Sequence, residues 1–132
     1  MKVSQLTGVL LDYWAARADG QTAKILRAGE KLNRVRLNED TCATLTPGYT
    51  DWWQPHYACT WFTAGPIVER EHLVVWPYRI LDWQDRANGV PQDFAAKRIG
   101  MPEPEATGPS YLIAAMRCFV ASRFGDTVPD EA

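Results

Sequence analysis

The chain has 132 residues, the length of one ordinary domain, and its 46% hydrophobic and 23% charged residues are typical of a globular protein rather than a disordered one. Its net charge of -2 excludes an overall basic surface, so nucleic acid is not an expected partner, although five basic residues against Glu30 give residues 24–36 a local charge of +4 that suits an anionic partner. Three widely spaced cysteines and the lack of a long apolar run exclude a disulfide scaffold and a membrane-spanning segment, so we expect a cytoplasmic protein that contacts no membrane.

The first predicted element is a helix over residues 4–19, because apolar residues recur there at steps of three and four. Ser4 is the expected N-terminal cap, since its hydroxyl can accept from a free amide of the first turn. Gly20 follows the helix, where a residue in the left-handed conformation is expected to end it.

The next part of the chain gives a weaker pattern. Residues 23–26 and 34–37 favour strands, and the second alternates clearly between apolar and basic residues. Residues 23–32 are equally compatible with a short helix, so both alternatives remain open. Residues 38–48 predict a loop that ends in the turn Pro47-Gly48.

An aromatic region follows, with a predicted strand over residues 57–62. Pro66 is expected to open a short helix at its first position, where a missing amide hydrogen is tolerated. Residues 73–76 and 78–81 are rich in apolar and aromatic residues and predict two strands. Pro77 between them indicates a bend or an edge position.

The C-terminal part begins with residues 84–108, which are polar and rich in proline and glycine and predict an extended surface excursion. Residues 92–96 are its one expected helical turn. A second amphipathic helix is predicted over residues 109–124, with Gly125 ending it. Residues 126–132 predict a frayed acidic tail.

These elements predict a single α+β domain over residues 1–132. Its N- and C-terminal amphipathic helices are expected to pack on each other and on a small, mainly antiparallel sheet.

Three stretches of the chain share their order and spacing with a known family. They are Met1-Lys2-Val3-Ser4 through Leu10-Leu11-Asp12-Tyr13-Trp14-Ala15-Ala16-Arg17-Ala18, then Gly65-Pro66-Ile67-Val68-Glu69-Arg70-Glu71, then Leu112-Ile113-Ala114-Ala115-Met116-Arg117 with Ala121-Ser122-Arg123-Phe124-Gly125-Asp126. Together they resemble the NinX-type proteins, small accessory proteins of phages and prophages, although Thr60 stands where the family has an aspartate. The resemblance implies a phage or prophage origin and a place in the host cytoplasm. It transfers no catalytic residue, because the family has no established activity.

Cysteine, histidine and carboxylate side chains are the candidates for metal binding and catalysis in this sequence. His56 and Cys59 have a spacing that two metal ligands can use, but a closed zinc site needs four ligands, so no metal or cofactor is predicted. Cys59 beside a histidine would suit nucleophilic catalysis, yet a cysteine on an apolar segment is more often buried. Glu69 is a candidate acid or base, with local ion pairing at an exposed helix end as the simpler interpretation. No catalytic residue is predicted, and whether the protein is an enzyme is left open, with a non-enzyme preferred.

Tryptophan is the least ordinary feature, since six indoles exceed what a core of this size requires. Each indole N–H needs a polar partner, so several rings are expected at half-exposed positions, where aromatic and arginine side chains together form binding surfaces. The predicted binding residues are Trp61, Trp76, Trp83, Trp53, Arg34, Arg36, Glu69 and Arg70.

The preferred hypothesis is a non-enzymatic phage accessory protein that binds a host protein or associates with itself, for example as a homodimer. The alternative is a protein that sequesters a small, planar, nucleotide-like anion in a pocket lined by tryptophan and arginine. A small hydrolase is the third hypothesis. These three differ in what they require of the surface: a broad aromatic patch, a deep pocket, or an activated nucleophile.

Overall fold

The computed structural model describes residues 1–45 and 48–130, and helix α4 (Tyr111–Phe124) lies at its centre. Ser110 caps this helix by accepting the amide hydrogen of Ile113, and Gly125 ends it at a φ of 85°. The predicted helix over residues 109–124 is therefore confirmed. Burial extends beyond the one predicted face, since α4 contacts α1 (Gly8–Ala18) on one side. On another side it contacts a sheet of three strands, β6 (Leu73–Pro77), β7 (Phe94–Arg98) and β8 (Ala106–Gly108).

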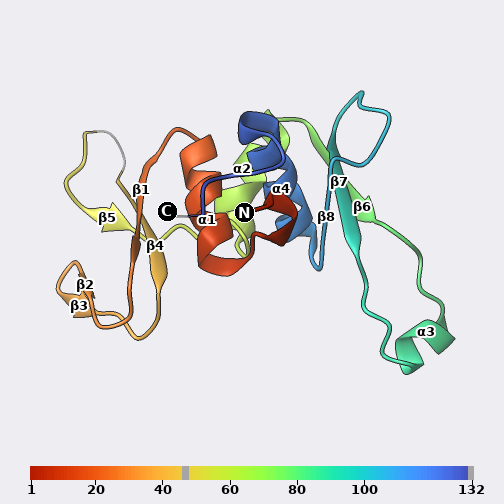
Figure 1. Cartoon of the computed structure of the whole chain (residues 1–132), viewed down its shortest axis with the longest axis horizontal. Coiled ribbons are helices and arrows are strands. Elements are labelled where there is room, and N and C mark those ends of the chain that lie inside the picture. The colour runs from red at the N-terminus through yellow and green to blue at the C-terminus, as the bar shows by residue number, and fades with distance from the viewer. Residues whose placement is uncertain (46–47, 131–132) are drawn as a thin grey trace.

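The molecule is layered along its long axis, with a small sheet at each end and helices between them (Figure 1). Helix α1 covers the sheet nearer the N-terminus of the chain, called the first sheet below, and α4 covers the second sheet, β6–β7–β8. The two helices pack on each other. This confirms the α+β class and the packing of the terminal helices. In the described residues, however, the strands form three small antiparallel sheets rather than one.

The N-terminal segment departs from the predicted helix over residues 4–19. A 3-10 helix, η1 (Val3–Gln5), precedes α1, and Leu6 between them is extended and fully buried. Ser4 is therefore not the N-cap; Thr7 holds that position without a side-chain hydrogen bond. The break has a tertiary cause, because the carbonyl of Leu6 accepts a hydrogen bond from the side chain of Arg117, in α4. Gly20, at a φ of 78°, follows α1 as predicted.

The first sheet has the order β1 (Thr22–Leu26), β4 (Thr41–Leu45), β5 (Trp52–Trp53). A hairpin of β2 (Lys31–Leu32) and β3 (Val35–Arg36) projects beside it. The strand predicted over 23–26 is confirmed, and the one over 34–37 is confirmed for Val35–Arg36 alone, because Arg34 belongs to the turn of the hairpin. The alternative helix over 23–32 is wrong.

The predicted loop over residues 38–48 is wrong for its central part, which forms β4. This strand is almost wholly buried between β1 and β5, so its small threonine, cysteine and alanine side chains fit where larger ones would not. Pro47 of the predicted turn lies outside the described residues.

The second sheet has the order β6 (Leu73–Pro77), β7 (Phe94–Arg98), β8 (Ala106–Gly108). The predicted strand over 73–76 is confirmed. The strand over 78–81 is wrong, and so are the helical turn over 92–96 and the surface excursion over 84–108, which contains β7 and β8. Two buried alanines in β7 fit against α4, and a Cβ at Gly108 would lie 2.8 Å from the side chain of Ile113. These small residues allow α4 to approach the sheet closely.

The aromatic region contains two further helices, α2 (Trp61–Arg70) and α3 (Trp83–Ala87). The predicted strand over 57–62 is wrong: Tyr57 and Ala58 lie in a buried turn, and α2 begins at Trp61. Pro66 is inside α2 instead of opening it.

The described part of the tail, residues 126–130, is not frayed. Lys2 pairs with Thr127 in an isolated β-bridge, and the amide hydrogen of Val128 binds the carbonyl of Met1 at 2.9 Å. Val128 is buried against the core. The predicted frayed tail overlooked the burial of this one valine among acidic residues. The last two residues of the predicted tail, 131–132, lie outside the described residues.

Candidate functional site

The structure separates the six tryptophans sharply by burial. Trp14 belongs to the core and is 4% exposed, whereas Trp53, Trp61 and Trp83 are 57%, 54% and 76% exposed. Trp52 and Trp76 are half-buried. Most indoles therefore lie where a partner can reach them.

The predicted binding residues do not form one site (Figure 1). Trp53 lies on β5 at one end of the molecule, together with the hairpin that carries Arg34 and Arg36. Trp76 on β6 and Trp83 on α3 lie at the other end. Trp61, at the start of α2, lines a separate groove.

This Trp61 groove consists of two adjoining cavities of about 400 and 390 Å³, each lined by Trp61 and Tyr111. The first lies between α2, β6 and the start of α4. The second lies between the turn before α2 and the start of α4. Neither lining contains a charged side chain; the remaining lining residues are Val68, Leu73, Val75, Ala58, Cys59, Ser110, Leu112 and Ile113.

A buried carboxylate positions the turn from which α2 starts. Asp12 on α1 accepts the amide hydrogen of Ala58 at 2.8 Å. Burial raises the pKa of Asp12 to about 6, against the opposing effects of this hydrogen bond and of His56. The amide of Thr60 then binds the carbonyl of His56 at 2.8 Å. The indole of Trp61 is thus attached to α1 through a short, rigid turn.

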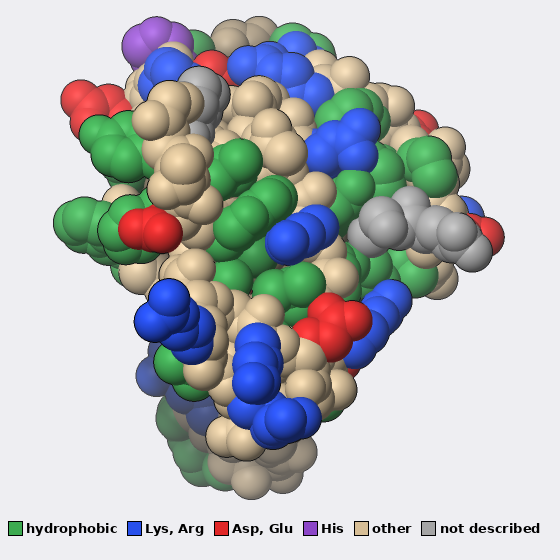
Figure 2. Space-filling model, turned by 90° about the vertical axis from the view of Figure 1, so that its left-hand side faces the viewer, with side chains coloured by type: hydrophobic (Ala, Val, Ile, Leu, Met, Phe, Trp, Pro, Cys, Tyr) green, Lys and Arg blue, Asp and Glu red, His purple; other side chains and the backbone are tan. Residues whose placement is uncertain are grey.

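The second exposed surface, the hairpin surface, lies at the end of the molecule that carries β5. It has a cavity of about 320 Å³ lined by Leu32, Asn33, Val35, Leu37, Trp52, Trp53 and Gln54. The side-chain amide of Asn33 donates to the carbonyl of Trp52 at 2.8 Å and joins the hairpin to β5. Figure 2 shows Lys and Arg side chains over the lower part of this face, where the hairpin lies, below a group of hydrophobic side chains.

Arg70 at the end of α2 belongs to an ion-pair network rather than to a pocket. Its guanidinium lies 2.9 Å from Asp19 and 3.1 Å from Glu71, and it faces the ring of Phe119. Glu71 also binds Arg123 of α4. Burial alone would raise the pKa of Glu71, but the two guanidinium groups outweigh it and hold that pKa below its ordinary value.

Two of the stretches that carried the family resemblance supply this network with Arg70, Glu71 and Arg123, and Asp19 directly follows the first stretch. Glu69 is exposed beside it, and the local ion pairing predicted for this helix end is present between Arg70 and Glu71.

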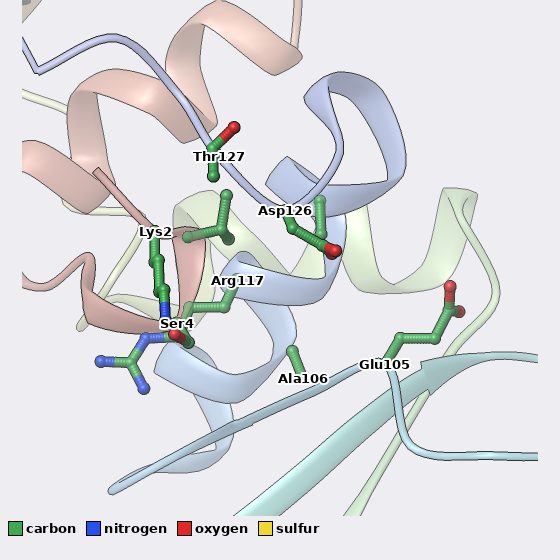
Figure 3. Close-up of a pocket in the computed structure, with 9 residues that line it drawn as sticks. Lys2, Ser4, Glu105, Ala106, Arg117, Asp126 and Thr127 are labelled. Atoms are coloured by element: carbon green, nitrogen blue, oxygen red, sulfur yellow. The ribbon is translucent and has the colours of Figure 1, made fainter.

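The sequence analysis missed Arg117, which is 8% exposed in the middle of α4. It extends toward the N-terminal segment along a cavity of about 320 Å³ that Lys2, Ser4, Asp126 and Thr127 also line (Figure 3). Its guanidinium donates to the carbonyls of Leu6 and Thr107, each at 2.9 Å. Burial lowers its pKa. Arg117 thus holds η1, α4 and β8 together. The available signal was an arginine in the middle of an apolar helix, away from its last turn.

No activated nucleophile is visible in the described residues. The Sγ atom of the exposed Cys59 has one weak polar contact, with the Oγ1 atom of Thr60 at 3.9 Å. Burial raises the pKa of Cys42 and of Cys118 to about 12, which keeps both thiols protonated. Within residues 1–45 and 48–130, no three His, Cys, Asp or Glu side chains are grouped closely enough to hold a metal ion, and no helix is long and apolar enough to cross a membrane.

No curated protein matches the chain. The family described as Bacteriophage P22, NinX, matches residues 2–123. This match includes the region between residues 21 and 58, which the three stretches of resemblance left uncovered. The chain therefore belongs to the NinX family.

Proposed function

We propose that the protein is a non-enzymatic binding protein of a phage or prophage, which acts in the host cytoplasm by docking on another protein through the Trp61 groove. The observation that carries the proposal is a groove without charged lining, bordered by an indole that is 54% exposed. Phe62 beside it is 90% exposed. Soluble proteins seldom leave adjoining aromatic side chains uncovered unless a partner covers them.

The chemistry of the groove favours an apolar protein surface as its occupant. Tryptophan and tyrosine are enriched among the residues that dominate protein–protein binding energies, because they bury a large area with few rotatable bonds. A host protein or a second copy of this chain can supply such a surface. The tests below distinguish these two partners.

The alternative ligand, a small planar anion, requires an indole and a guanidinium that enclose it from two sides. Arg70 lies over Phe119 instead of an indole, 5.7 Å from the ring centroid. The Trp61 groove has no cation in its lining. These contacts favour a protein partner, and nucleotide titration provides a direct comparison.

The experiment compares Trp61→Ala with Trp83→Ala, since both variants remove an exposed indole and only Trp61 lines the groove. Sedimentation of the purified protein measures self-association, and capture from host lysate measures binding to a host protein. We expect Trp61→Ala to abolish the complex and Trp83→Ala to retain it, with both variants keeping the melting temperature within a few degrees.

Two results would contradict the proposal. One is an equal effect of both substitutions on every complex that forms. The other is a nucleotide that raises the melting temperature of the wild type, while no protein complex depends on Trp61.

A further inference from the structure

The hairpin of β2 and β3 places like charges directly opposite each other. Lys31 pairs with Arg36 and Leu32 pairs with Val35, so one face of the ribbon is basic and the other is apolar. The turn residues Asn33 and Arg34 have φ angles of 50° and 72°, the conformation of a tight two-residue hairpin.

The basic face of this hairpin has unneutralised charge. Arg27 is paired with Asp40 at 3.0 Å, but no carboxylate pairs with Lys31, Arg34 or Arg36 among the residues that the structure describes. Like charges opposite each other in an antiparallel ribbon are destabilising. An anionic group bound between them would relieve that repulsion.

The apolar face lines the cavity beside β5, together with Trp52 and Trp53. Val35 is 65% exposed, an unusual value for a valine in a strand. Lys24 covers the ring of Trp52 at 3.9 Å and adds a further cation at this end of the molecule. The ribbon is only two strands wide, and Lys and Arg side chains lie below hydrophobic ones on this side of the molecule (Figure 2), so a segment that crosses the ribbon can reach both the apolar cavity and the cations.

We propose that the hairpin surface binds an acidic segment of a protein partner, with an apolar side chain of that segment in the cavity and its carboxylates on Lys31, Arg34 and Arg36. The cavity is lined by three aliphatic side chains, two indoles and two amide side chains, and this lining can accept an apolar side chain of the segment. The net charge of -2 opposes a long polyphosphate, whereas a short acidic segment needs only the local cations of the hairpin. The inference specifies a partner within the proposed binding function, on a surface separate from the Trp61 groove.

The test uses a synthetic peptide in which glutamate alternates with leucine and phenylalanine, and follows the tryptophan resonances of the full chain by NMR. We expect the peptide to perturb Trp52 and Trp53, and its affinity to fall with added salt. Lys31→Glu should weaken binding about tenfold, whereas Lys97→Glu, on the other sheet, should leave it unchanged.

Lys31→Glu separates binding from folding, because it creates an opposite-charge pair with Arg36 and should leave the hairpin as stable as before or more so. Asp51→Asn should strengthen binding by removing a nearby negative charge. Unchanged peptide affinity in Lys31→Glu would overturn the inference. So would tighter binding of single-stranded oligothymidylate than of the peptide.

The two proposals fail separately. Trp61→Ala should leave the affinity for the acidic peptide unchanged, because Trp61 lines a different cavity. Peptide binding that survives while no complex depends on Trp61 would reject the groove and retain the hairpin surface. The reverse result would reject the hairpin surface alone.

Discussion

The Trp61 groove and the hairpin surface both expose an indole, but they differ in charge and in support. The groove is lined without charge and lies on helices that are attached to the core. The hairpin surface carries cations that have no carboxylate partner in the described part of the chain, on strands of two residues each. We therefore expect apolar burial to dominate binding at the groove, with little effect of salt, and electrostatic attraction to dominate at the hairpin.

The difference in support also predicts where substitutions affect stability. Beneath the groove, the turn before α2 depends on the buried Asp12, and the helix ends are joined through Glu71. The hairpin is held to β5 through one side-chain bond from Asn33. Changes in the helical frame should thus alter folding, and changes on the hairpin should alter binding with little effect on folding.

The largest expected effect is that of Arg117→Ala. The substitution leaves the carbonyls of Leu6 and Thr107 without their donor and removes a buried stem, so the free energy of unfolding should fall by about 3 kcal/mol. Urea denaturation measures it. Arg34→Ala on the hairpin is the control and should change stability by no more than about 0.5 kcal/mol. Similar losses in both variants would remove the distinction between frame and hairpin.

Asp12→Asn should raise the free energy of unfolding at neutral pH by about 2 kcal/mol, because the amide oxygen still accepts from Ala58 and no buried charge remains. In the wild type, the folded carboxyl keeps its proton up to a pKa of about 6, well above its ordinary value of 3.8. Folded protein binds more protons between these values, so wild-type stability should fall as pH rises through them.

Denaturation curves at several pH values test this assignment. The variant should lack that part of the wild-type pH dependence. A variant that is less stable at neutral pH and retains the slope would show that Asp12 is ionised without penalty.

Glu71→Gln should lower the free energy of unfolding by about 1 kcal/mol at low salt, since it weakens the contacts with Arg70 and Arg123 that join α2 to α4. The pKa of Glu71 is depressed, so its stabilising contribution is present above its ordinary pKa and is lost as pH falls through the folded value. Melting curves at low and high salt measure it. An effect independent of salt would indicate lost packing instead of lost ion pairs.

The smallest expected effect is a gain of about 0.5 kcal/mol in Lys31→Glu, from the opposite-charge pair with Arg36. Thermal unfolding compares the variant with the wild type. A clear loss of stability would mean that the cations already have anionic partners within the protein.

The helices could be predicted from the sequence where local signals agreed with packing. The periodic apolar residues and Gly125 located α4, and Gly20 marked the end of α1. Local signals failed where tertiary contacts decided the structure: the bond from Arg117 to Leu6 interrupts the N-terminal helix. Strand β4 was missed because it lies in a segment that ends in a turn signal, and β7 because its surroundings are rich in proline and glycine and residues 92–96 suit a helical turn. Only their burial in the fold shows why small residues are needed there.

The candidate site was predictable in composition and not in arrangement. Exposed indoles were expected, and Trp53 does lie at the same end of the molecule as Arg34 and Arg36. Trp76 and Trp83 lie at the opposite end, because residues 84–108 form a second sheet instead of an excursion. Tyr111, which lines both cavities of the Trp61 groove, gave no signal beyond its place at a helix start.

Fluorine NMR of 5-fluorotryptophan-labelled protein tests the docking proposal most directly, because each indole reports its own environment. On addition of the captured partner, or with rising protein concentration if the chain self-associates, the Trp61 resonance should shift or broaden while that of Trp83 stays fixed. A complex that forms with the Trp61 resonance unmoved would contradict docking at the groove.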